Sequence, residues 1–165
     1  MKVTLFKIND LDVNNLDVAT LNEYYFKTMH HEFTHILNQR KPYDTNYDRI
    51  TESSYVGSDW YQIYDEQALQ MGFISPYAMD RGSEDFAEML SIFVTNTADT
   101  WESYLEAAEP NPNSPYYKAG VDGRAILEQK FDIVYKYMKD SWGVDLYELR
   151  DVVQRRQGEI NTLFN

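Results

Sequence analysis

The stretch from Asp17 to Gln39 constrains the fold most, because it contains neither glycine nor proline. Apolar, aromatic and histidine side chains recur along it every three or four residues, which predicts one long α-helix. Arg40 and Lys41 follow, where the helix dipole favours cations, and Pro42 marks the end. We expect the helix to be buried on more than one side, because further apolar side chains cover much of its remaining surface: Phe26, Met29, Phe33, Ile36 and Leu37.

Two histidines, His31 and His35, lie one helical turn apart in this stretch, and Glu32 directly follows the first. Residues four apart share a helix face, with Cβ atoms roughly 5–6 Å apart, so both imidazoles can bind one tetrahedral Zn²⁺. Glu32 lies about 100° around the helix from His31. From there its carboxylate can take a proton from water and pass it to a leaving amine. This HExxH arrangement is typical of zinc peptidases; the alternative is a helix whose histidines only pack or face solvent.

A catalytic zinc needs a third protein ligand and an open fourth position, and this chain has no cysteine. His30 is a poor candidate because it projects about 100° away from His31. A later, mostly apolar helix is a better source, with Ser83 as its expected N-cap. Glu84 and Glu88 share one face there, so Glu84 could bind the metal while Glu88 accepts the remaining N–H of a ligating histidine. The alternative is that both acids only stabilise the helix dipole.

An HExxH helix followed by a glutamate on a second helix resembles the gluzincin metallopeptidases, including the thermolysin-like enzymes. In those enzymes an acid that supports the site follows the ligand glutamate by four residues, which is the spacing of Glu84 and Glu88. The stretch from Tyr77 to Glu88 also resembles the zinc-glutamate region of anthrax lethal factor, where a tyrosine seven residues before the ligand lies near the metal. The resemblance implies that the phenol of Tyr77 could donate a hydrogen bond to an oxyanion.

Three segments, His31–Tyr43, Gly72–Ala78 and Glu84–Leu90, are together similar to the substrate import-associated zinc metallohydrolase lipoproteins of gut-type Gram-negative bacteria. The resemblance implies a zincin-like, mainly α (α+β) domain with a small N-terminal β element. It also implies a zinc-dependent peptidase that hydrolyses peptide bonds by zinc-activated water, with a glutamate as general base. The alternative is a non-catalytic or weakly catalytic zinc-binding accessory component of an outer-membrane nutrient-import system.

The same resemblance implies a lipoprotein of the cell envelope that is attached to the outer membrane and acts on peptide or glycopeptide substrates. It also implies an outer-membrane import complex as a partner. This chain has neither an apolar leader nor a cysteine to be acylated. We therefore expect residues 1–165 to be a single catalytic domain, the C-terminal part of a longer secreted lipoprotein whose membrane contact is a lipid anchor.

The overall composition fits one domain, since 165 residues with 43% hydrophobic side chains suffice for a single core. The net charge of −12 argues against nucleic acid and anionic membrane surfaces as partners, because both need basic patches. No apolar run approaches the ~20 residues that span a bilayer.

Outside the metal site, Val3–Ile8 alternates like a short strand, either an edge that pairs with extended substrate or part of an upstream domain. Asp10–Asn15 resembles the start of a calcium loop but lacks its glycine and closing glutamate, which favours a polar turn. Residues 41–58 are expected to form a loop with a helical turn near Thr51–Tyr55. Further helices are expected at 59–71, 83–96, 100–109, 122–141 and 145–157, the last two as scaffold.

Six aromatic residues between the two metal-site helices have two possible roles. They could line a substrate cleft and stack on peptide or sugar rings, or they could form the edge of the core. These residues are Tyr43, Tyr47, Tyr55, Trp60, Tyr61 and Tyr64.

Overall fold

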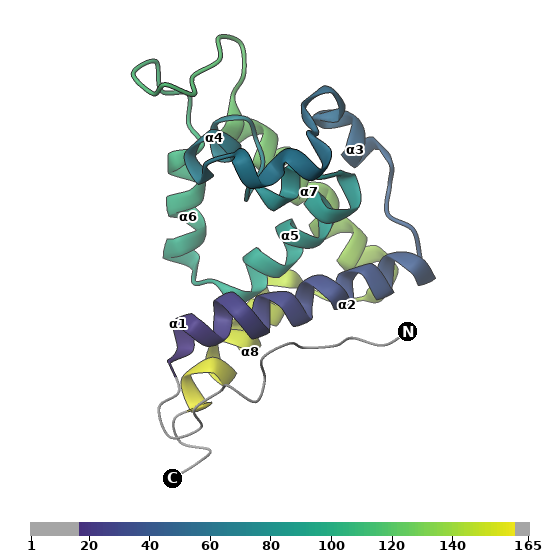
Figure 1. The fold of residues 1–165 in the computed structure, drawn as a ribbon. Helices are drawn as coiled ribbons and strands as arrows, with labels where there is room; N and C mark the ends of the chain where they lie inside the picture. The colour runs from purple at the N-terminus through teal and green to yellow at the C-terminus, as the bar shows by residue number, and fades with distance from the viewer. Residues whose placement is uncertain (1–16, 161–165) are drawn as a thin grey trace.

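The computed structural model describes residues 17–160, and within this range the chain is helical and has no strand (Figure 1). The mainly α class is thus confirmed, while the predicted strand at Val3–Ile8 and the turn at Asp10–Asn15 lie outside the described residues. The elements, in chain order, are α1 (Val18–Leu21), the π-helical turn η2 (Asn22–Phe26), α2 (Lys27–Arg40), α3 (Asn46–Ile50), the 3₁₀ turns η3 (Glu52–Ser54) and η4 (Gly57–Gln62), α4 (Asp65–Gln70), the 3₁₀ turn η5 (Tyr77–Met79), α5 (Gly82–Thr95), α6 (Ala98–Ala107), α7 (Gly123–Trp142) and α8 (Leu146–Glu159).

The predicted long helix is confirmed as the continuous run of α1, η2 and α2, which lies along one side of the molecule (Figure 1). It begins where the Asp17 carboxylate accepts hydrogen bonds from the first-turn amides and ends before Lys41, whose backbone is extended. The π-helical turn was not predicted. Its first residue, Asn22, donates to the Thr95 carbonyl (2.7 Å) and accepts from Gln157 (2.6 Å), so this turn is tied to the end of α5 and to α8.

One face of α2 differs from the expectation. We define the outer face of α2 as Met29, His30 and Phe33 together with Phe26, the last residue of η2. Met29 is 50% exposed and Phe33 is 53% exposed. The prediction that this helix is buried on more than one side is therefore wrong at Met29 and Phe33, which the described residues leave half exposed.

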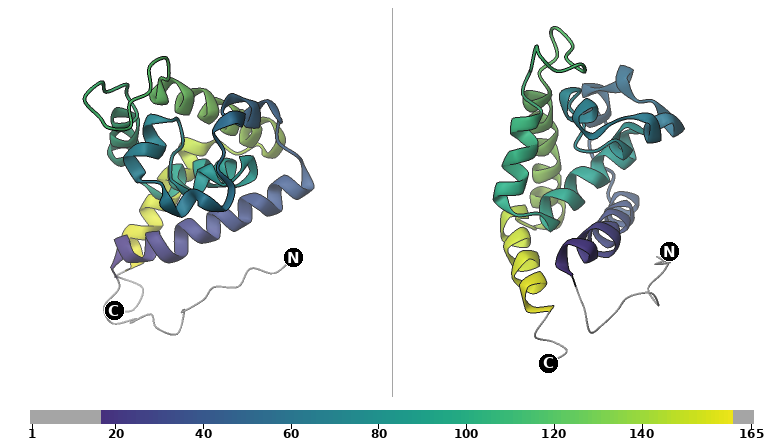
Figure 2. Two further views of the ribbon diagram at one scale, coloured as in Figure 1. Left: turned by 45° about the horizontal axis from the view of Figure 1, so that its top comes forward. Right: turned by 60° about the vertical axis from the view of Figure 1, so that its left-hand side comes forward.

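Helix α5 lies at the centre of the molecule, with α2 on one side and α7 and α8 on the other (Figures 1 and 2). From Asp85 onward every residue of this helix is buried. It begins at Gly82, so the expectation that Ser83 is the N-cap is wrong, and the N-cap position is held by Arg81 in extended conformation. A Cβ atom at Gly82 would lie 2.1 Å from the Asp48 carboxylate, so a glycine lets the chain enter the helix at this close approach.

The later helices α6, α7 and α8 confirm the predicted ranges to within two residues. The helix expected at 59–71 is wrong in part, because it divides into η4 and α4. Ile63 and Tyr64 between them are extended, with ψ angles of 138° and 153°, and this break lets Ile63 pack against the core. In the segment 41–58, the expected turn near Thr51–Tyr55 is confirmed as η3, and α3 was not predicted.

The core lies around α5 and includes buried residues of α2, α3, α4, α6, α7 and the start of α8, in agreement with the scaffold role expected for the last two helices. Leu127, Phe131, Val134 and Leu146 are buried there, whereas Val152 on α8 is 46% exposed and does not join the core. None of the described helices is long and apolar enough to cross a bilayer.

Three of the six aromatic residues belong to the core or its edge. These are Tyr43, Tyr47 and Tyr55. Trp60 packs edge-to-face against Tyr77, with ring centres 5.0 Å apart, and thereby reaches the neighbourhood of the histidines. Tyr61 and Tyr64 are exposed.

Candidate metal centre

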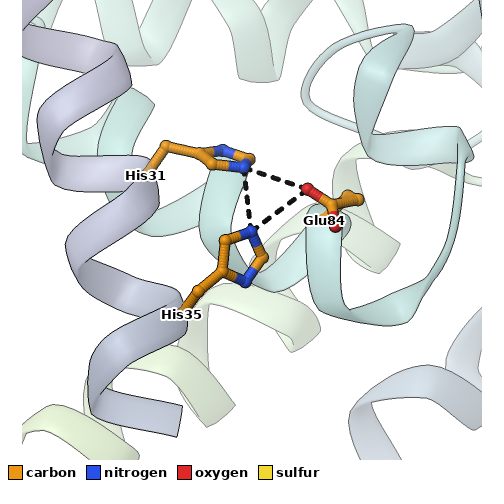
Figure 3. A group of neighbouring side chains, drawn as sticks. All are labelled: His31, His35 and Glu84. Atoms are coloured by element: carbon orange, nitrogen blue, oxygen red, sulfur yellow. Dashed lines mark hydrogen bonds and ion pairs between the residues drawn. The ribbon is translucent and has the colours of Figure 1, made fainter. Parts of the chain in front are cut away.

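The side chains of His31 and His35 project from α2 toward Glu84 in the first turn of α5 (Figure 3). The Nε2 atom of His31 lies 3.0 Å from Oε2 of Glu84, and the Nε2 atom of His35 lies 3.1 Å from the same oxygen. The two Nε2 atoms are 3.0 Å apart. His31 is buried, and the other two are half-buried, so the group lies at the edge of the α2–α5 interface and remains accessible from one side.

This donor set fits a zinc ion. Zinc binds imidazole nitrogen and carboxylate oxygen at about 2.0–2.2 Å, and tetrahedral geometry then separates two ligand atoms by roughly 3.3 Å. The three separations of 3.0, 3.0 and 3.1 Å are close to that value. Two imidazole nitrogens and a carboxylate oxygen that converge on one point need a proton or a cation between them. With three protein ligands, the fourth position of a tetrahedral zinc is left for water or substrate.

Glu88, one turn further along α5, orients the first histidine. Its Oε1 lies 2.9 Å from Nδ1 of His31. Its Oε2 accepts a hydrogen bond from Ser75 (2.7 Å) and lies 3.4 Å from Nζ of Lys27. An Nδ1–H that donates to Glu88 leaves Nε2 of His31 with its lone pair directed at Glu84 and His35, which is the tautomer that a metal ligand requires.

The charges around the site favour a positive occupant. Burial lowers the pKa of His31, but hydrogen bonds with Glu84 and Glu88 outweigh it and raise this pKa to about 9. Hydrogen bonds from His31 and His35 hold the pKa of Glu84 well below its usual range. Burial raises the pKa of Glu88, yet His31 and the Lys27 charge together keep it below the usual value. The site therefore holds positive charge strongly, as a proton or as a metal ion.

The other residues predicted for the site lie as follows. Tyr77 in η5 has its ring centre 5.6 Å from that of His31. Burial, then the Glu84 charge, raise its pKa to about 12, so the phenol keeps its proton at neutral pH. Glu32 is exposed and directly follows His31 on α2. His30 lies on the outer face of α2 and is not part of the converging group.

A buried ion pair behind the site was not predicted. Asp85, the residue after Glu84, lies 2.6 Å from Nζ of Lys130, and both side chains are fully buried. Lys130 also donates to the Gly72 carbonyl (2.9 Å), and Tyr55 donates to Asp85 (2.9 Å). The sequence held one signal, since Lys130 falls on the apolar stripe of α7, where a charge needs a buried partner. The identity of that partner was not visible in the sequence.

Lys27 and Ser75, which contact Glu88, were also missed. Lys27 is one turn before His31 on the metal-facing side of α2, which is a signal that spacing could have given. Both residues line a cavity of about 510 Å³ whose wall is formed by α1, η2, the start of α2, α4, the second half of α5 and Tyr104 of α6. Two residues of the cavity wall therefore contact Glu88, the side chain that orients His31.

Comparisons with known proteins identify the family of this chain. A family model described as "Putative zinc-binding metallo-peptidase" matches residues 1–147. The chain is also similar to a solved structure, the crystal structure of a "putative zinc-binding metallo-peptidase" from Bacteroides caccae ATCC 43185, with 42% sequence identity and a TM-score of 0.80. The match covers 93% of this chain but 54% of the other, so this chain spans about half the length of that protein. The comparison with curated proteins gives no match. Since the family model covers most of its length, the chain belongs to this family of zinc-binding metallopeptidases.

Proposed function

We propose that this chain is a zinc-dependent peptidase in which His31, His35 and Glu84 bind the metal and Glu32 is the general base. One observation carries the proposal: three ligand atoms from two helices converge at 3.0–3.1 Å, directly beside an exposed glutamate. A zinc site with only a structural role usually closes its fourth position with another protein ligand. Three protein ligands with a neighbouring carboxylate are instead typical of a zinc site that catalyses hydrolysis.

Each residue has a distinct task in this proposal. Bound zinc supplies a Lewis acid that polarises a carbonyl and makes water more acidic. The carboxylate of Glu32 accepts a proton from the attacking water and delivers it to the amide nitrogen as the C–N bond breaks. The phenol of Tyr77, which keeps its proton at neutral pH, donates a hydrogen bond to the carbonyl oxygen as that oxygen gains negative charge. Glu88 holds His31 in the ligating tautomer.

The cavity of about 510 Å³, whose wall includes Lys27 and Ser75 but none of the three ligand residues, offers space for a part of the substrate away from the reacting bond. Ser75 lies in its wall, and Tyr77, two residues further, has its ring beside that of His31, so one short segment connects the cavity wall with the candidate metal centre. The lining combines apolar Leu69 and Ile74 with polar and charged groups. This mixture suits an amphipathic peptide or glycopeptide segment better than a purely apolar ligand.

Cleavage of a diverse peptide and glycopeptide library, followed by mass spectrometry, tests the proposal. Zinc-loaded protein is compared with Glu32→Gln, with Glu84→Ala and with Glu148→Gln, an exposed glutamate on α8, as the matched control. We expect Glu32→Gln to keep zinc and to lose at least ~100-fold in rate, as removal of a general base does. Glu84→Ala should lose zinc as well, and Glu148→Gln should cleave normally. Full cleavage by Glu32→Gln contradicts its role, and zinc binding without cleavage of any substrate favours an accessory zinc-binding protein.

A further inference from the structure

The outer face of α2 is a patch of large apolar side chains that the described residues leave uncovered. Phe26, Met29, His30 and Phe33 together line a shallow cavity of about 290 Å³. Met29 and Phe33 are half exposed, 50% and 53% respectively. Isolated exposed apolar residues are ordinary, but a contiguous group on one helix marks a surface that something covers.

The patch lies on the back of the metal helix. At 100° per residue, Phe33 projects about 200° around the axis from His31, and Met29 projects about 160° from it. His31 faces α5, which is therefore on the opposite side of the helix from the patch. A segment bound to the outer face would complete the burial of α2 without covering the ligand atoms.

We propose that residues 3–8 of this chain bind to the outer face of α2. This segment, Val-Thr-Leu-Phe-Lys-Ile, contains four large apolar side chains within six residues. Such a segment gains most by burying these side chains against a complementary apolar surface.

The length of the connecting chain permits this arrangement. The nine steps from Ile8 to Asp17 can span about 30 Å when extended. Along the helix, Phe33 lies only about 22 Å beyond Val18, at 1.5 Å per residue. Residues 3–8 can therefore reach any part of the patch, running back along α2.

The two other candidate occupants fit less well. A second copy of this chain would bring together two molecules of net charge −12, and such self-repulsion keeps proteins monomeric. An anionic lipid surface is disfavoured by the same charge. Residues 2–8 are different, since they contain two lysines and no acid, and so approach an acidic molecule with favourable charge.

The absence of native cysteine makes disulfide trapping a clean test. Leu5→Cys or Phe6→Cys is combined with Phe33→Cys, and each pair is oxidised in dilute zinc-loaded protein. Tyr24→Cys replaces Phe33→Cys in the control pairs. Tyr24 is 60% exposed and nearer to residues 3–8 along the chain, but it lies roughly half a turn of the helix away from Phe33. A disulfide forms only when the two Cα atoms come within about 7 Å.

We expect the yield of intramolecular disulfide to be at least fivefold higher with Phe33→Cys than with Tyr24→Cys. We also expect one of positions 5 and 6 to give the higher yield, because neighbouring side chains of a segment bound in extended form would face opposite sides. Equal yields with both helix positions overturn the proposal, because they indicate a free tether. Disulfide-linked dimers of the Phe33→Cys single variant also overturn it, because they assign the face to a second copy.

Amide hydrogen exchange gives a second, independent readout. Phe33→Asp changes an exposed side chain, so the described core should be retained, and exchange of residues 3–8 should accelerate at least tenfold relative to the wild type. Tyr61→Asp, at an aromatic position elsewhere that is 68% exposed, is the control and should leave this exchange unchanged. Equal exchange rates in all three proteins overturn the proposal.

Discussion

Asp85 follows the proposed metal ligand Glu84 in the chain, yet its Oδ2 lies 2.6 Å from the ammonium of Lys130, and neither side chain of this pair is exposed. Glu84 therefore faces the metal site while its neighbour faces the core. Because Lys130 also donates to the Gly72 carbonyl, one buried cation fastens the start of α5 to α7 and to the segment after α4. Glu84 lies in the same helical turn as this anchor.

Replacing Lys130 with Met should lower the free energy of unfolding by ~3–5 kcal/mol, because it leaves the Asp85 carboxylate buried without its partner. Urea unfolding of the metal-free protein measures this change. The double variant with Asp85→Asn should recover much of the loss, since it removes the unpaired charge. A loss below ~1 kcal/mol in the single variant would show that water replaces the ammonium and that the pair is not an anchor.

Metal removal should make stability depend on pH above neutrality. The pKa of His31 is raised from 6.5 to about 9, so its protonated form stabilises the metal-free fold below pH 6.5, and this contribution is lost as pH rises through about 9. The free energy of unfolding of chelator-treated protein should fall over that window by at most ~1.4 kcal/mol per pH unit. Zinc-loaded protein should not show this fall, because the metal takes the place of the proton.

Parallel urea titrations with chelator and with zinc, at several pH values from 6 to 9.5, measure this difference. His31→Gln is the control, since it removes the titrating group and should remove the fall in metal-free protein. If the free energy of unfolding falls by the same amount in metal-free wild type and in metal-free His31→Gln, the fall comes from other titrating groups.

Truncation of Glu88 to Ala should weaken zinc binding by ~10–100-fold, the usual effect of removing a carboxylate that orients a ligating histidine. Competition against a chromophoric chelator measures the zinc affinity. Glu88→Gln retains an oxygen that can accept from Nδ1 of His31 and should lose less. Glu148→Ala on α8 is the control and should bind zinc as the wild type does. Unchanged affinity in Glu88→Ala would mean that packing alone orients His31.

Two helical glycines should respond to alanine with opposite signs. A Cβ atom at Gly123, the first residue of α7, would lie 2.2 Å from the Leu69 carbonyl oxygen, whereas a Cβ atom at Gly158 in α8 meets nothing within 4 Å. Gly123→Ala should therefore destabilise the protein by ~1–3 kcal/mol through overpacking. Gly158→Ala should stabilise it by ~0.5–1 kcal/mol, because alanine is the better helix former. Thermal unfolding of both variants decides, and a Gly123→Ala variant as stable as the wild type or more stable would contradict the described packing at Gly123.

The convergence of His31, His35 and Glu84 could be predicted in part because it depends on local spacing. Four residues separate His31 from His35, and the same spacing separates Glu84 from Glu88, so once each segment is helical its pair shares a face. The contacts between particular imidazole nitrogens and carboxylate oxygens depend on the packing of α2 against α5, which the sequence does not give. Lys130 escaped prediction because its partner is 45 residues away, and spacing along one helix says nothing about such a contact.

The helices could be predicted where one apolar face points at the core, as in α6 and α7. The break at Ile63 and Tyr64 could not be predicted, because an apolar residue such as Ile63 packs against the core equally well from an extended segment and from a helix. The exposed outer face of α2 escaped for a related reason. Apolar residues predict burial, but they do not reveal whether the covering segment belongs to the same part of the chain.

The π-helical turn Asn22–Phe26 closes on a bond from the Lys27 amide to the Asn22 carbonyl, five residues back instead of four. This geometry accommodates one more residue than a regular turn, so a family member with an uninterrupted α-helix here should show a one-residue gap when its sequence is aligned with this one. The gap would leave the spacing of the two histidines intact. It would rotate everything before Asn22 by about 100° about the helix axis and so redirect the incoming chain.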